Sequence, residues 1–223
     1  SSDPLSGSSM SGTPVDLKFV KSGYTGKNND GTMESQVSAN PDYGFSIVKW
    51  VGSGTAGDTV GHGLTPASKS MLVIMKDLSA SNDWMVMTND LWSTPNQQYL
   101  KINTTAGVAT SGADIYNVNN TTFKNDYRNT AGSSYVAYCW AAIPKYSKIG
   151  SYTGGSSGKQ VTGLGFQPRF LVIKRTDSAG GWRVQDAERL GTPPSDKNVL
   201  EWNDSYQEQV DYVDLAFDAG GFT

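Results

Sequence analysis

The chain contains two similar apolar segments, Ser70-Met-Leu-Val-Ile-Met-Lys76 and Arg169-Phe-Leu-Val-Ile-Lys-Arg175. Each holds the run Leu-Val-Ile, with stretches rich in Gly, Ser, Asn or Asp nearby. A short, continuous apolar run with turn residues nearby is typical of a strand that is covered on both faces. We therefore expect each segment to form a central strand of a β-sheet.

The residues around the two segments also match, and the matched residues lie roughly 98 to 101 positions apart throughout. A spacing that stays nearly constant over such a length is not expected by chance, so we interpret the chain as two tandem copies of one unit. Each copy is longer than a solenoid repeat and has the length of a small β unit. The clearest matched pairs are Leu72 with Leu171, Gly63 with Gly163, Trp84 with Trp182 and Phe123 with Phe222.

We place the first copy at residues 43–144 and the second at 145–223, and interpret residues 1–42 as a linker or the end of a preceding domain. The second copy lacks a counterpart of Ser134–Ala142, which has the strongest strand pattern in the chain. A sheet that lacks a strand exposes unpaired backbone groups beside an apolar face. We therefore predict that the second copy is truncated, with a gap in its sheet near Tyr212–Thr223.

Three remedies for that gap stay open at this point. The N-terminal segment around Leu17–Lys21 could fold back, a neighbouring subunit could supply a strand, or the native chain could continue past Thr223. The last is favoured because the sequence breaks off in the middle of a unit.

Short apolar runs separated by turn residues recur along the whole chain, whereas no window shows a sustained helical period with capping residues. The fold class that we expect is all-β, with two tandem β-sandwich or jelly-roll-like units and little or no helix. The predicted strands are Leu17–Val20, Phe45–Val51, Ser70–Lys76, Trp84–Thr88, Gln98–Asn103, Ser134–Ala141, Lys148–Tyr152, Phe170–Arg175, Trp182–Asp186, Val199–Asn203 and Tyr212–Phe217.

The composition excludes several classes of function. The formal net charge is −3, whereas nucleic-acid binding needs clustered Lys and Arg. No apolar run is long enough to span a membrane. A single Cys and a single His rule out a disulfide framework and a Cys- or His-rich metal site, and no cofactor motif is present. Cys139 lies in an apolar run, so we expect it to be buried and reduced in an interior strand.

Two groups of residues carry the chemistry that an enzyme would need. His62 could act as a general base, but its setting between two glycines favours a turn residue with a local hydrogen bond. Paired carboxylates could hydrolyse a glycosidic bond, but those of the second copy have no acidic counterparts in the first, which favours a solvated acidic face. These carboxylates are Glu201, Asp204, Glu208, Asp211 and Asp214.

The tryptophans offer a different kind of site, because an exposed aromatic ring can stack on a sugar. Most aromatic residues of an all-β protein serve as core or cross-strand pairs. Trp92 and Trp202 are better candidates for glycan stacking than the repeated pair Trp84 and Trp182.

The segments GFSIVKWVGSGTAGDTVGHGL, YVAYCWAAIPKYSKIGSYTGG and GFQPRFLVIKRTDSAGGW resemble a repeat domain of uncharacterised marine bacteriophage proteins. In those proteins the domain often follows a laminin-G-like or concanavalin-like jelly-roll domain, and it occurs in predicted tail fibres and other virion surface proteins. The resemblance covers Gly44 to Thr223. It implies a virion location and a binding or structural role, without any catalytic motif.

We therefore expect a non-catalytic bacteriophage virion protein, such as a tail fibre, an adhesin or a capsid-decorating subunit. Its expected partners are other virion proteins, further copies of itself, with a trimer favoured, and a host surface glycan. The alternatives are a phage polysaccharide depolymerase and a carbohydrate-binding module of a secreted enzyme.

Overall fold

A computed structural model describes residues 24–65, 70–89, 98–111, 116–155, 158–189, 198–210 and 215–223. These residues form antiparallel β-sheets, with one short 3-10 helix, η1 (Asp126–Arg128). The expected all-β fold is therefore confirmed. Within the described ranges, no helix has the length and hydropathy that a membrane span requires.

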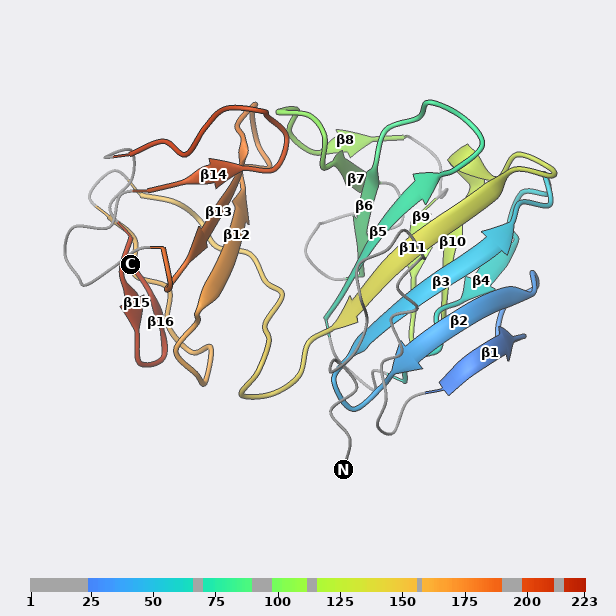
Figure 1. Cartoon of the computed structure of the whole chain (residues 1–223), viewed down its shortest axis with the longest axis horizontal. Coiled ribbons are helices and arrows are strands. Elements are labelled where there is room, and N and C mark those ends of the chain that lie inside the picture. The colour runs from blue at the N-terminus through green and yellow to red at the C-terminus, as the bar shows by residue number, and fades with distance from the viewer. Residues whose placement is uncertain are drawn as a thin grey trace, which may run out of the picture.

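The largest sheet has eight strands in the order β1-β2-β3-β11-β5-β6-β7-β8 (Figure 1). All neighbouring strands in it are antiparallel. In chain order these strands are β1 (Tyr24–Asn28), β2 (Ser35–Asn40), β3 (Phe45–Val51), β5 (Met71–Asp77), β6 (Met85–Thr88), β7 (Gln98–Lys101), β8 (Ala109–Thr110) and β11 (Ser134–Ala141).

A second sheet, of three strands, covers one face of the first. It has the order β4 (Thr59–Gly61), β10 (Thr122–Asn125) and β9 (Tyr116–Val118). Alternate residues of β11 are buried, and they share one core cluster with residues of the small sheet such as Val60 and Phe123. Burial of alternate residues between two sheets is the arrangement of a β-sandwich. We call β1–β11 with their loops the first unit.

The rest of the chain, residues 145–223, is called the second unit here. It contains a three-stranded sheet, β12 (Phe170–Lys174), β13 (Trp182–Asp186) and β14 (Leu200–Glu201). It also contains a two-stranded sheet, β15 (Phe217–Asp218) and β16 (Gly221–Phe222). Leu215 and Phe222 are the buried centre of a small cluster that includes Leu171 and Ile173 from β12.

Matched positions of the two units share local geometry. The backbone N–H groups of Ile102 and Trp202 donate to the carbonyl oxygens of Trp84 and Trp182, at 3.1 and 3.0 Å. The pairing of Val60 with Phe123 recurs as the bridge between Val161 and Phe222. These local matches agree with two tandem copies, which stay a prediction.

Six of the predicted strands are present within one residue of the expected bounds, namely β3, β5, β6, β11, β12 and β13. Two others, β7 and β14, are shorter than predicted. The expectation for Cys139 is confirmed, since it is a fully buried, free cysteine in β11 between β3 and β5. The predicted strand Leu17–Val20 and residues 212–214 of the predicted strand Tyr212–Phe217 lie outside the described residues.

Three expectations need correction. Residues 24–40 are not a linker in the structure, because β1 and β2 pair with each other and β2 pairs with β3. Lys148–Tyr152 is not a strand. In the described residues β12 pairs only with β13, so it is an edge strand there rather than a central one.

Candidate functional site

The most exposed aromatic pair of the second unit is Phe170 with Trp202. Phe170 begins β12 and is 56% exposed, and Trp202 follows β14 and is 49% exposed. Their ring centroids are 6.2 Å apart, with the planes inclined at 38°. The structure therefore places the candidate Trp202 at the surface, next to an aromatic partner that the sequence analysis did not select.

With Trp84 matched to Trp182, the pairing of β5 with β6 and of β12 with β13 aligns Leu72 with Phe170. The expected match of Leu72 with Leu171 is therefore shifted by one residue in the structure. The positions that match Phe170 and Trp202 in this register carry Leu72 and Ile102, which are partly buried against a core cluster. The pair of exposed rings thus belongs to the second unit alone. This exchange of two aliphatic residues for two aromatic ones is visible only in the strand register, because the sequence match of Leu72 with Leu171 sets Phe170 against Met71. The other candidate, Trp92, lies outside the described residues.

Short backbone contacts hold Trp202 in place. Its N–H donates to the carbonyl oxygen of Trp182, and the side-chain oxygen of Asn203 accepts the N–H of Trp182 at 2.6 Å. The N–H of Asp204 reaches the carbonyl oxygen of Glu201 at 3.3 Å, and this contact closes the turn. A backbone that is hydrogen-bonded on both sides of the residue fixes where the side chain leaves the chain, which lowers the entropic cost of stacking a ligand on its ring.

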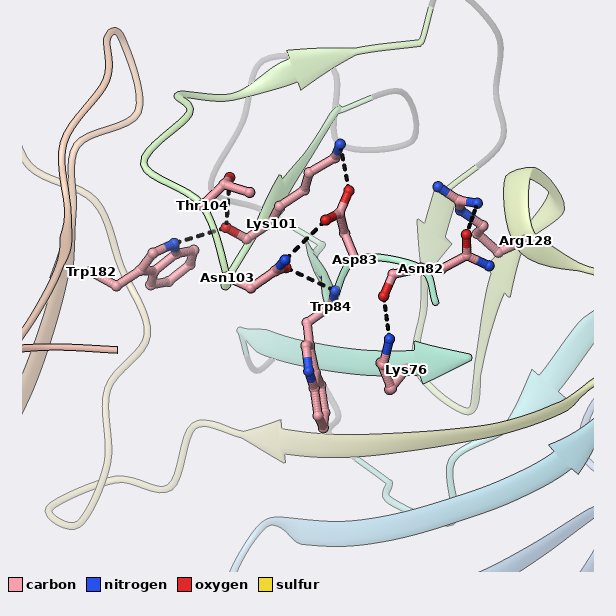
Figure 2. Close-up of polar contacts among 9 residues, drawn as sticks. All are labelled: Lys76, Asn82, Asp83, Trp84, Lys101, Asn103, Thr104, Arg128 and Trp182. Atoms are coloured by element: carbon pink, nitrogen blue, oxygen red, sulfur yellow. Dashed lines mark hydrogen bonds and ion pairs between the residues drawn. The ribbon is translucent and has the colours of Figure 1, made fainter. Parts of the chain in front are cut away.

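Trp182 has the opposite role, since it is 6% exposed and packs against Ile74, Val86 and Leu100 of the first unit. Its indole Nε1–H donates to the carbonyl oxygen of Lys101 at 3.0 Å (Figure 2). Buried tryptophans usually find such a partner for the indole N–H. Trp182 therefore attaches the second unit to the first.

Backbone contacts surround Trp182 at this junction. The carbonyl oxygen of Thr105 accepts the Nζ–H of Lys174 and the N–H of Gly180, both at 2.8 Å. The N–H of Val108 donates to the carbonyl oxygen of Thr176 at 2.8 Å. The loop after β7 is thus bonded directly to the loop between β12 and β13.

A polar network anchors the start of that loop (Figure 2). Asp83 forms an ion pair with Lys101 at 2.7 Å and accepts a hydrogen bond from the side-chain amide of Asn103 at 2.9 Å. The hydrogen bond from Lys101 and that from Asn103 lower the pKa of Asp83. The side-chain oxygen of Asn103 in turn accepts the N–H of Trp84 at 3.0 Å. The network fixes the end of β7, where the carbonyl oxygen of Lys101 accepts the indole N–H of Trp182.

The acidic residues of the second unit do not form one cluster in the described residues. Arg189 bridges Asp186 and Glu208, with a nitrogen–oxygen distance of 2.6 Å to each. Asp204 accepts the N–H of Tyr206 at 3.2 Å within a turn. Asp211 and Asp214 lie outside the described residues. No group of three or more His, Cys, Asp or Glu side chains that could bind a metal occurs in the part of the chain that the structure describes.

His62 is fully buried after β4, and both of its ring nitrogens are engaged. Nδ1 accepts the N–H of Leu64 at 3.1 Å, so the neutral ring carries its proton on Nε2 and donates it to the carbonyl oxygen of Asn119, also at 3.1 Å. Burial lowers the pKa of His62, although the carbonyl oxygen of Asn119 and the charge of Asp30 oppose this shift. The predicted local hydrogen bond is present, and the side chain is out of reach of a ligand.

The chain was also compared with known proteins. No curated protein and no solved structure matches it. One family model does, over residues 7–223, and it is described as a domain of unknown function. The match spans the N-terminal strands and both units, and the chain therefore belongs to the DUF7483 family, a domain of unknown function.

Proposed function

We propose that this chain is a non-catalytic structural or surface protein of a bacteriophage virion, and that it binds a host surface glycan through Phe170 and Trp202. The observation that carries the proposal is the pair of exposed rings, one at the start of β12 and the other on the turn after β14. The all-β fold, the polar surface of low charge and the sequence resemblance to phage virion proteins support the location.

A sugar ring has an apolar face made of C–H groups, and stacking it on an aromatic ring removes both surfaces from water. Roughly 25 cal/mol is gained per Å² of apolar surface that is buried. Covering a substantial part of one exposed ring corresponds to about 1–2 kcal/mol, or roughly a 10-fold change in affinity. Two rings inclined at 38° offer stacking surfaces to two neighbouring sugars of a chain. A polysaccharide therefore suits this surface better than a monosaccharide.

Titration of the purified protein with capsular and lipopolysaccharide glycans of candidate hosts tests this proposal. Both Trp202→Ala and Phe170→Ala should weaken binding by about 10-fold or more. The matched control is Trp140→Ala. Trp140 is also exposed, and its ring centroid lies 5.1 Å from that of Phe45, but this pair belongs to the first unit. Equal affinity of all variants would refute the assignment of the site.

The same samples test the non-catalytic assignment. Prolonged incubation with each glycan should release no reducing ends and no unsaturated sugars. Release that stops with Glu201→Gln or Asp204→Asn would instead make the protein a depolymerase. Immunogold labelling of intact particles tests the virion location, and sedimentation tests whether the chain forms the expected trimer.

A further inference from the structure

A carboxylate lies directly beside the exposed ring of Phe170. Phe170 and Asp186 are cross-strand partners at the end of the ladder between β12 and β13. The next pair in this register, Arg169 with Ala187, is joined by a hydrogen bond at 2.8 Å, so Phe170 and Asp186 form a non-hydrogen-bonded pair. The side chains of such a pair leave the same face of the sheet and lie close together. Asp186 therefore belongs to the polar surroundings of the ring pair.

The arginine that neutralises Asp186 is occupied by other groups of the protein. Arg189 donates through Nε to Asp186 and through one terminal nitrogen to Glu208, both at 2.6 Å. Its other terminal nitrogen donates to the carbonyl oxygen of Val184 at 3.2 Å. An arginine recognises the carboxylate of a ligand by offering it two parallel N–H groups. Because all three nitrogens of Arg189 are engaged, it has no pair of free nitrogens to offer.

The other cations near the start of β12 and along β12 and β13 are committed as well. Arg169 forms an ion pair with Glu188. The ammonium group of Lys174 donates to two backbone carbonyl oxygens, at 2.6 and 2.8 Å. Arg183 stands opposite Glu201 in the ladder between β13 and β14, and its position in β13 directs it to the face that Phe170 does not share. A ligand on the ring pair thus finds its cationic neighbours already paired.

Negative charge is in excess around Trp202. Asp204 lies on the same turn, where one of its oxygens accepts the N–H of Tyr206 at 3.2 Å, and within the described residues its carboxylate forms no ion pair. The sequence from Arg169 to Asp214 contains six Lys or Arg residues against nine Asp or Glu residues, which leaves a net charge of −3. The ring pair is therefore surrounded by an acidic surface.

We propose that the ring pair selects neutral polysaccharides and discriminates against those that carry carboxylate, sulfate or phosphate groups. This inference rests on the proposed glycan binding and names the class of glycan. An anionic sugar needs a cation to offset the loss of its hydration, and at this surface it meets like charges instead. The hydroxyl groups of a neutral sugar can donate hydrogen bonds to a carboxylate such as that of Asp204. The rings supply the affinity, and the carboxylates around them supply the selection.

A glycan and its oxidised form are the matched probes for this selection. Each capsular and lipopolysaccharide glycan of the titration above is tested before and after its primary hydroxyl groups are oxidised to carboxylates. Acidic glycans are also tested after their carboxylates are reduced to alcohols. Oxidation should weaken binding about 3-fold or more at low salt, and reduction should strengthen it by a similar factor.

The salt dependence gives the sign of the electrostatic contribution. Raising the NaCl concentration from about 10 mM to about 500 mM should leave the affinity for a neutral glycan unchanged. The same change should strengthen binding of the oxidised form, because salt screens the repulsion between its carboxylates and those of the protein.

Two variants identify the groups responsible. Asp204→Asn and Glu208→Gln each remove one negative charge with little change of shape, and Glu208→Gln also releases one nitrogen of Arg189 from its ion pair. Each should reduce the preference for the neutral over the oxidised form by about 2-fold at low salt. The matched control is Glu34→Gln, because Glu34 is an exposed acid that pairs with Lys27 on the first unit at 3.0 Å. This control should leave the preference unchanged.

The outcomes separate this inference from the proposed function. Equal or tighter binding of the oxidised form, or binding of that form that weakens as salt is added, would overturn the selection and leave glycan binding intact. An unchanged preference in both Asp204→Asn and Glu208→Gln would overturn the role of the carboxylates. Absence of binding to every glycan would refute the glycan site and the selection together.

Discussion

Replacing Trp182 with alanine should detach the second unit from the first and lower the free energy of unfolding by several kcal/mol. The side chain is 6% exposed, and it packs against three buried aliphatic residues of the first unit. A buried tryptophan covers roughly 150–250 Å², which at about 25 cal/mol per Å² corresponds to about 4–6 kcal/mol. Residual burial in the unfolded chain reduces this figure to about 3–5 kcal/mol, the usual cost of truncating a buried aromatic residue.

The indole hydrogen bond adds little to this cost. The carbonyl oxygen of Lys101 also faces the N–H and the hydroxyl of Thr104, both at 3.4 Å, so it keeps polar neighbours when the indole is removed. Trp182→Phe retains most of the apolar surface but lacks the indole N–H. Beyond its small loss of packing, it should therefore lower the free energy of unfolding by only about 1 kcal/mol, the value of the lost hydrogen bond. Comparing the two variants separates packing from hydrogen bonding.

Urea unfolding followed by tryptophan fluorescence, with hydrogen exchange to locate the change, is the assay. The wild-type protein should unfold in one transition, and Trp182→Ala should show an earlier transition confined to β12–β16. Trp84→Ala is the matched control, because Trp84 occupies the equivalent place in the first unit but is only partly buried in the same cluster. A loss below about 1 kcal/mol for Trp182→Ala, or an equal loss for Trp84→Ala, would refute the reasoning.

Three further outcomes are expected. Burial lowers the pKa of His62 in the folded protein, so the unfolded chain takes up the proton first, at a pKa near 6.5. The free energy of unfolding, measured with urea, should therefore fall as the pH drops below that value. His62→Gln should flatten this pH dependence. Burial raises the pKa of Cys139 to about 12, so a maleimide at pH 8 should label it only after denaturation, and rapid native labelling would contradict its position. Gly107→Ala would place a Cβ 2.7 Å from the carbonyl oxygen of Thr176, and it should lower the free energy of unfolding by about 1–3 kcal/mol. Gly154→Ala is the control, because a Cβ at this position would meet no atom of another part of the chain within 4 Å, and it should be neutral in the same unfolding assay.

The sequence predicts the strands that are buried on both faces and misses those that are held mainly by their neighbours. The run Leu-Val-Ile identifies β5, because a central strand needs apolar residues on both sides. β1 and β2, with the sequences YTGKN and SQVSAN, show little of this pattern; β2 is held by backbone pairing with β3, and β1 by pairing with β2. The same run could not reveal that β12 lies at an edge, since side chains record what covers the faces of a strand and not what pairs with its sides.

The candidate site was predictable in part, through the comparison of the two copies. Trp182 has a tryptophan counterpart in Trp84, and it is buried. Trp202 has no aromatic counterpart, and it is exposed. Its neighbour Phe170 was missed because it lies inside an apolar strand sequence, where a phenylalanine is expected in the core.

The place of β11 in its sheet has a consequence for how the protein is made. β11 is the last strand of the large sheet to leave the ribosome, yet it lies between β3 and β5. Until residue 141 has emerged, β1–β3 and β5–β8 are two separate half-sheets, each with an exposed apolar edge. The two halves join only through contacts between residues about 60 to 95 positions apart, such as Phe45 with Trp140. Such non-local closure slows folding, so the nascent chain passes through a period in which it depends on protection from aggregation.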